Sequence, residues 1–180
     1  MNPNHRIDIS IESPDWAAAL ANAEAIAERA AAAALASETQ ALELSLLLTG
    51  DEFVRALNRD YRGRDEATNV LSFPGEAPQE GDPVTGRPVL LGDVVVAFGV
   101  MQREAEVDDR GISLADHLSH LVIHGVLHLL GHDHQHEAEA EVMEQFEARL
   151  LSGLGIDNPY RDPGPGTACK RESQDERRAR

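Results

Sequence analysis

Two histidines spaced one helical turn apart form the strongest chemical pattern in this sequence. His124 and His128 are four residues apart, so on a helix their side chains stand on the same face. That spacing lets two imidazoles bind one metal ion, as in zinc hydrolases. Gly131 can then end the helix in the left-handed conformation, and the turn can bring His134 back as a third nitrogen ligand. Three protein ligands leave one position of a tetrahedral zinc ion for water or substrate, which is typical of a catalytic site.

The surrounding stretch is apolar, so it could instead be a buried core helix that carries satisfied histidines. Burying several unpaired imidazoles is costly, which favours the metal site. His117 and His120 lie on the same predicted helix. His120 and His128 would be about 12 Å apart along a straight helix, so they cannot share one ion. We expect His132 and His136 to be exposed.

The residue after the first histidine argues against ordinary metalloprotease chemistry. Zinc proteases with this spacing place a glutamate there as general base for the attacking water. Here the residue is Gly125, which cannot accept a proton and costs about 1 kcal/mol in a helix interior relative to alanine. A glycine at this position predicts that another group approaches the helix backbone closely.

Length and composition indicate one globular domain. The chain has 180 residues, of which 42% are hydrophobic, and this is enough for a sizeable core. No apolar run approaches the roughly 20 residues that cross a bilayer, and the N-terminus lacks the pattern of a signal peptide. Cys169 is the only cysteine, so no intramolecular disulfide can form. These features predict a cytoplasmic protein.

The chain is strongly acidic, with a formal net charge of −16. Residues 157–180 carry six basic and five acidic groups, so the residues before them carry −17. Affinity for a phosphate backbone usually comes from clustered lysine and arginine, so this balance is not that of an obvious nucleic-acid binder. The one dense basic cluster in the predicted domain comprises Arg55, Arg59, Arg62 and Arg64. Charge alone leaves open whether this cluster contacts nucleic acid or is a solvated surface.

Hydrophobic periodicity predicts an α+β fold with about four strands and about five helices around a small mixed sheet. The predicted strands cover residues 7–11, 42–50, 68–73 and 89–98, and the predicted helices cover 15–36, 51–62, 100–107, 113–130 and 137–152. A mobile loop is expected at 75–88. The inner face of the last helix is expected to comprise Val142, Phe146 and Leu150. The predicted domain ends at residue 156, and the polar 157–180 tail is expected to be disordered.

Three segments together resemble the YbeY family, bacterial metal-dependent endoribonucleases of ribosomal RNA maturation. They are LNRDYRGRDEATNVLSFP at 57–74, LGDV at 91–94 and HGVLHLLGHDH at 124–134. The segments occur in the family's order, and the resemblance covers roughly residues 7–151. The histidine motif with glycine after its first histidine, joined to TNVLSFP, is a specific signature.

The resemblance implies one zinc ion per chain, held by His124, His128 and His134, on the helix and the turn that follows it. It also implies that Arg62 lines the active cleft as a catalytic residue. A guanidinium pairs with phosphate in a two-pronged geometry and can stabilise charge on a phosphodiester under attack. The alternative for Arg62 is a surface residue just beyond a helix end.

The implied activity is that of a single-strand-specific endoribonuclease in ribosomal RNA maturation, which processes the 3′ end of 16S rRNA, and in ribosome quality control. The implied partners are the rRNA precursor and the ribosome, with small-subunit proteins or assembly factors, and we expect neither a membrane nor a DNA partner. Either a metal-bound water or the RNA 2′-hydroxyl could be the nucleophile. A second hypothesis is a non-catalytic ribosome-assembly factor whose structural zinc is closed by His132 or His120. A metallopeptidase with a base from elsewhere in the chain is a third.

Overall fold

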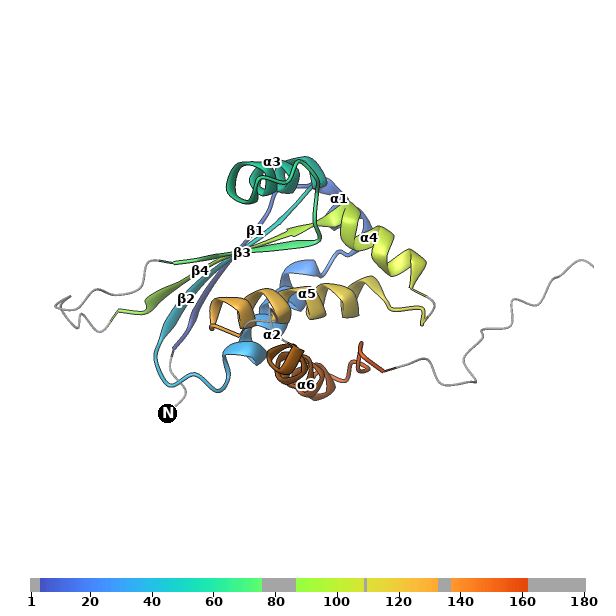
Figure 1. Ribbon diagram of the computed structural model, residues 1–180. Helices are drawn as coiled ribbons and strands as arrows, with labels where there is room; N and C mark the ends of the chain where they lie inside the picture. The colour runs from blue at the N-terminus through green and yellow to red at the C-terminus, as the bar shows by residue number, and fades with distance from the viewer. Residues whose placement is uncertain (1–3, 76–86, 109, 133–136, 162–180) are drawn as a thin grey trace, which may run out of the picture.

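The computed structural model describes residues 4–75, 87–108, 110–132 and 137–161 (Figure 1). The elements in chain order are β1 (Arg6–Ile11), α1 (Pro14–Ala19), α2 (Ala23–Leu35), β2 (Leu42–Thr49), α3 (Asp51–Arg62), β3 (Val70–Pro74), β4 (Val89–Ala97), α4 (Phe98–Val107), α5 (Leu114–Leu129) and α6 (Glu137–Gly153). The predicted α+β class is confirmed. Most of the loop expected at 75–88 lies outside the described residues. In the described part of the chain, no helix has the length and apolar character to span a membrane.

The four strands form one mixed sheet in the order β1-β2-β4-β3. β1, β2 and β4 run parallel, and β3 pairs antiparallel with β4, where Ser72 lies opposite Val94. The alternating leucines of β2 point to one face, where they form the main core with α2 and α5. A smaller apolar cluster under α3 covers part of the other face. Figure 1 shows α3 on one side of the sheet, α2 and α5 on the other, and α6 beyond α5.

The N-terminal helical region consists of two helices, whereas the sequence pattern predicted one helix over 15–36. The chain leaves α1 at Leu20 and starts α2 after Asn22. Asparagine is a poor residue for a helix interior because its side chain competes for backbone hydrogen bonds. α1 has its own anchor in the core, since the buried Trp16 donates its ring N–H to the Thr49 carbonyl oxygen at 3.1 Å. The described chain therefore has six helices instead of about five.

The inner face of α6 differs from the one predicted. The structure buries Met143, Glu147 and Leu151 and leaves Val142 60% exposed. The other two predicted residues, Phe146 and Leu150, are half-buried. Successive residues of a helix are turned by about 100°, so the buried stripe is displaced by one position from the expected one. This displacement brings a carboxylate to the side of α6 that faces α5.

Candidate active site

Helix α5 carries the histidine pair, and its two ends are well defined. At its start, the Ser113 side chain accepts a hydrogen bond from the backbone N–H of Asp116 at 3.1 Å, as an N-cap residue does. At its end, Gly131 has φ +89° and donates to the His128 carbonyl oxygen, while His132 donates to Leu127. This pair of bonds is the glycine-dependent Schellman ending. The helix therefore stops within one turn of His128, as its sequence predicted.

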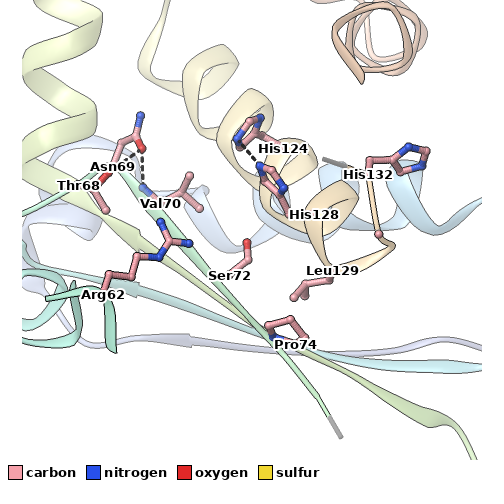
Figure 2. A pocket seen from close by; sticks show the side chains of 11 residues that line it. Arg62, Thr68, Asn69, Val70, Ser72, Pro74, His124, His128, Leu129 and His132 are labelled. Atoms are coloured by element: carbon pink, nitrogen blue, oxygen red, sulfur yellow. Dashed lines mark hydrogen bonds between the residues drawn. The ribbon is translucent and has the colours of Figure 1, made fainter. Parts of the chain in front are cut away.

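His124 and His128 face one another on the last two turns of α5 (Figure 2). Their Nε2 atoms are 3.1 Å apart, and both side chains are half-buried. Two nitrogens bound to one tetrahedral zinc at 2.0–2.1 Å would be about 3.3 Å apart. Neutral imidazole is a common zinc ligand, so this donor pair fits the expected ion in both chemistry and spacing.

The proposed third ligand, His134, lies outside the described residues, as does His136. Among the residues that the structure does describe, no group of three or more histidine, cysteine or acidic side chains is placed to hold a metal ion. His132 was expected to be exposed, but it is half-buried and lines the same pocket as the pair. Its ring lies against Phe146, with the ring centroids 5.5 Å apart.

The close approach predicted at Gly125 comes from the sheet. The Ser72 hydroxyl donates to the Gly125 carbonyl oxygen at 2.9 Å. A Cβ atom at position 125 would lie 2.7 Å from Val94 Cγ1 and 3.1 Å from Ser72 Oγ. Position 125 thus faces β3 and β4, where a glutamate side chain has no room. The lack of a side chain lets α5 lie directly on the strands that form the floor of the site.

A cleft of about 540 Å³ runs between the end of α3, strand β3 and the end of α5. The residues that line it are Arg62, Thr68, Asn69, Val70, Ser72, Pro74, His124, His128, Leu129, Gly131 and His132. Arg62 is the last residue of α3, which ends at Gly63 with φ +70°. Figure 2 shows its guanidinium extended from α3 toward the space in front of the histidine pair. The structure therefore brings together three of the four residues expected at the site.

Two members of the basic cluster are paired with acidic residues. Arg55 makes a two-pronged contact with Asp65 at 2.8 and 2.9 Å, and Arg59 contacts Asp60 at 2.8 Å. Between described residues, neither Arg62 nor Arg64 takes part in an ion pair. Of the cluster's four arginines, Arg62 is the member that lines the cleft.

A polar network fixes the turn before β3, and this turn forms one wall of the cleft. The Asn69 amide donates to both oxygens of Glu104 at 3.1 Å, and His117 Nε2 lies 2.8 Å from the same carboxylate. Asn69 Oδ1 in turn accepts from the backbone N–H of Val70 at 2.7 Å. Burial raises the pKa of Glu104, but the hydrogen bonds from His117 and Asn69 outweigh it and lower the pKa. His117 therefore supports the wall of the cleft from a position away from the histidine pair.

A second carboxylate lies behind the pair, and sequence reasoning missed it. Glu147 of α6 is only 1% exposed and contacts His120, His124 and Tyr160. Burial alone would raise its pKa, but hydrogen bonds from these three side chains lower the pKa to about 2. The available signal was its spacing of four residues from both Met143 and Leu151, which share its buried face. The composition of α6, with many exposed glutamates, concealed this position.

Comparison with known proteins matches this chain to one family over most of its length. The family model described as Endoribonuclease YbeY matches residues 8–155. The Endoribonuclease YbeY of Paramagnetospirillum magneticum is 49% identical over 157 residues, which cover 86% of this chain and 94% of that protein. That of Maricaulis maris is 47% identical over 165 residues, with 89% and 96% covered. That of Rhodopseudomonas palustris strain BisB5 is 47% identical over 161 residues, with 86% and 81% covered.

A solution structure of a Thermotoga maritima protein aligns with 89% of this chain and covers 98% of its own, at 24% identity and a TM-score of 0.46. The family model and the relatives carry the same name, and the range that the model matches, residues 8–155, includes Arg62 and the histidine pair. The chain therefore belongs to the YbeY family of endoribonucleases.

Proposed function

We propose that the chain is a zinc-dependent endoribonuclease that cuts single-stranded RNA during ribosomal RNA maturation, at the 3′ end of 16S rRNA, and in ribosome quality control. The observation that carries this proposal is the cleft in which Arg62 faces His124 and His128. A phosphate-binding cation and a metal-binding pair on opposite walls of one open cleft suit a phosphodiester substrate. The endoribonuclease names of the relatives support the same class of reaction.

The residues of the cleft have separate tasks in this proposal. The Arg62 guanidinium holds a phosphate of the RNA and stabilises the negative charge that grows on it during attack. His124 and His128, together with His134, hold one zinc ion through neutral ring nitrogens. When bound, zinc would polarise a phosphoryl oxygen or lower the pKa of a bound water. The turn at Asn69, held by Glu104, keeps the wall of the cleft at a fixed distance from α5.

The charge distribution bears on how RNA reaches the cleft. Acidic side chains offset Arg55 and Arg59, and the residues before the tail carry −17. Affinity for free RNA therefore depends on few phosphate contacts and should be low. We propose that the ribosome, through small-subunit proteins or assembly factors, delivers the precursor RNA to the enzyme in the cytoplasm. Neither a membrane nor DNA is a partner in this proposal.

Two features of the site bear on the alternatives. A structural zinc is normally closed by a fourth protein ligand. One candidate, His120, has its Nε2 atom 3.0 Å from the buried carboxylate of Glu147. The other candidate, His132, lines the cleft, but among the described residues no third histidine, cysteine or acidic side chain is placed to hold a metal ion with His124 and His128.

A peptidase of the usual kind has its general base directly after the first histidine, and position 125 faces Val94 and Ser72 without room for one. A peptidase with a base from elsewhere in the chain is tested below with casein. These observations support an open site for a phosphodiester.

The test is cleavage of a short single-stranded RNA that spans the 3′ processing site of the small-subunit RNA. A duplex of the same sequence and the protein casein serve as comparison substrates. The zinc-loaded protein should cut the single strand and leave the duplex and casein intact, and His128→Ala or removal of zinc by a chelator should abolish cleavage. Cleavage that persists after both treatments would contradict the zinc role. A loaded protein that cuts no RNA would favour the assembly-factor alternative.

A further inference from the structure

Glu147 occupies an unusual place for a carboxylate. It lies on α6, four residues from Met143 and from Leu151, and all three side chains are buried. Burying an ionised carboxylate is costly unless hydrogen bonds replace its water. Both oxygens of Glu147 have partners: Oε1 lies 2.8 Å from His124 Nδ1, and Oε2 lies 3.0 Å from His120 Nε2. The carboxylate therefore joins α6 to the histidine face of α5.

The contact with His124 determines which ring nitrogen carries the proton. A carboxylate accepts hydrogen bonds, so Nδ1 must be the protonated nitrogen of His124. A neutral imidazole has one N–H, which leaves a lone pair on Nε2. That Nε2 atom points to His128 Nε2, 3.1 Å away. In metal sites, a ligand histidine commonly donates its other N–H to a carboxylate, which sets the tautomer and the ring orientation.

Glu147 is itself held from two sides. The Tyr160 hydroxyl donates to Glu147 Oε2 and also lies 3.1 Å from His120 Nε2. The Tyr160 and His120 rings meet edge to face, with centroids 5.7 Å apart. Two donors on Oε2 fix the plane of the carboxylate, so Oε1 stays directed at His124. Tyr160 belongs to residues 157–161, beyond the end of α6.

We propose that Glu147, anchored by His120 and Tyr160, is a positioning residue that sets the tautomer and ring orientation of His124 for the active site. Four side chains from α5, α6 and the segment after α6 form one hydrogen-bonded group behind the site. Tyr160, which the sequence pattern assigns to a polar tail, thereby supports the active centre. The consequence for zinc affinity rests on the proposed function, whereas the position of the His124 proton does not.

The first test measures zinc affinity by competition between the metal-free full-length protein and a coloured chelator. Glu147→Gln should weaken zinc binding by about 10- to 100-fold, as the loss of such supporting carboxylates does. Tyr160→Phe, which removes one hydroxyl from a residue that is 40% exposed, should weaken it less and in the same direction. Glu141→Gln, on the exposed side of the same helix, is the control and should bind zinc like wild type. Wild-type affinity in both folded Glu147→Gln and Tyr160→Phe would overturn the proposal.

The second test needs neither metal nor RNA. Nitrogen-15 NMR of the histidine rings in the metal-free protein should show His124 with its proton on Nδ1 in wild type and Glu141→Gln. Glu147→Gln should populate the other tautomer, and Tyr160→Phe keeps this test possible if Glu147→Gln does not fold. A His124 proton on Nε2 in wild type would overturn the proposal.

The two proposals fail in different ways. Failure to bind zinc and cut RNA, with the predicted tautomer shift intact, would remove the proposed function and leave the positioning role. Zinc binding and RNA cleavage that are unchanged in Glu147→Gln, together with an unchanged tautomer, would remove the positioning role alone.

Discussion

The Ser72 hydroxyl donates a hydrogen bond to the Gly125 carbonyl oxygen at 2.9 Å, and this contact joins strand β3 to the helix that carries the histidine pair. Position 125 lies on the sheet side of α5, between His124 and His128 in the sequence. The same strand contributes Val70 and Ser72 to the floor of the cleft. The separation of β3 and α5 therefore sets both the depth of the cleft and the place of the histidines above it.

Gly125→Ala should destabilise the protein although alanine favours helices. The added methyl would lie 2.7 Å from Val94 Cγ1, in a buried β-branched side chain that has little freedom to move. Overpacking costs about 1–3 kcal/mol, against about 1 kcal/mol gained in helix preference, so a net loss of up to about 2 kcal/mol is expected. Denaturant unfolding measures it. Gly153→Ala, where nothing lies within 4 Å, is the control and should cause no loss.

Because of the same close contact, Gly125→Glu should not turn the protein into a peptidase. A carboxylate forced between α5 and β3 would be buried without a partner, so we expect a larger loss of stability than for alanine. RNA cleavage should be lost and no casein cleavage gained. A folded Gly125→Glu variant that cuts RNA like wild type would contradict the close packing at this position.

Zinc content should depend on three histidines. The purified protein should bind close to one zinc per chain, and alanine at His124, His128 or His134 should remove most of it, because two nitrogens hold the ion much less well than three. His117→Ala should keep its zinc, since His117 contacts Glu104 on the far side of the cleft wall. Metal analysis after dialysis gives the readout. Full zinc retention in His134→Ala would remove that residue from the ligand set.

Arg62→Ala should separate activity from stability. The side chain is exposed at the end of α3, so the free energy of unfolding should change by no more than about 0.5 kcal/mol. RNA cleavage at matched zinc occupancy and fixed salt should fall at least about tenfold, because a charge-assisted contact in the transition state is lost. Lysine should restore part of the rate, as it lacks the two-pronged geometry.

Arg64→Ala is the matched control, since it removes the same charge two residues away and outside the residues that line the cleft. Its cleavage rate should stay close to wild type. An equal fall in rate for Arg62→Ala and Arg64→Ala would mean that the cluster acts only through its total charge, and a wild-type rate for Arg62→Ala would remove Arg62 from the site.

Acid should weaken the metal-free protein partly through Glu147. Its pKa is lowered from an ordinary value of 4.5 to about 2, so the folded state favours the ionised form. That stabilisation is fully present above about pH 4.5 and is lost as the pH falls toward 2. A shift of this size corresponds to about 3 kcal/mol. The stability difference between wild type and Glu147→Gln, from denaturant unfolding, should therefore shrink by about that amount over this range, and a constant difference would contradict the lowered pKa.

The boundary of the functional domain should lie after Tyr160. A chain that ends at residue 161 keeps the Tyr160 hydroxyl on Glu147, whereas one that ends at 159 loses it. A hydrogen bond to a charged group contributes about 1.5–3 kcal/mol, so the shorter chain should melt at a lower temperature and the longer one close to wild type. Equal melting temperatures for the two truncated chains would show that residues 160 and 161 add nothing to the fold.

Local sequence patterns determined the parts of this protein that depend on near neighbours in the chain. The spacing of His124 and His128, the glycine at 131 and the alternating leucines of β2 set a helix face, a helix end and a buried strand. Each of these effects acts within about one helical turn or one strand, so the sequence carries the whole signal. The family-specific segments likewise lie in continuous runs.

Tertiary structure decided the contacts between distant segments. In the sequence, Glu147 looks like the exposed glutamates around it. Its burial against α5 is possible because three donors, 13 to 27 residues away, form hydrogen bonds with the carboxylate. The need for glycine at position 125 comes from strands β3 and β4, which lie too close to α5 there for a side chain. Arg62 and the histidine pair come from elements about 60 residues apart, and only the packing of α3 and α5 around the sheet edge brings them to one cleft. The sequence pattern indicates whether a residue lies on the buried or the exposed face of its helix or strand. The residue that it contacts there depends on how the helices and strands pack in three dimensions.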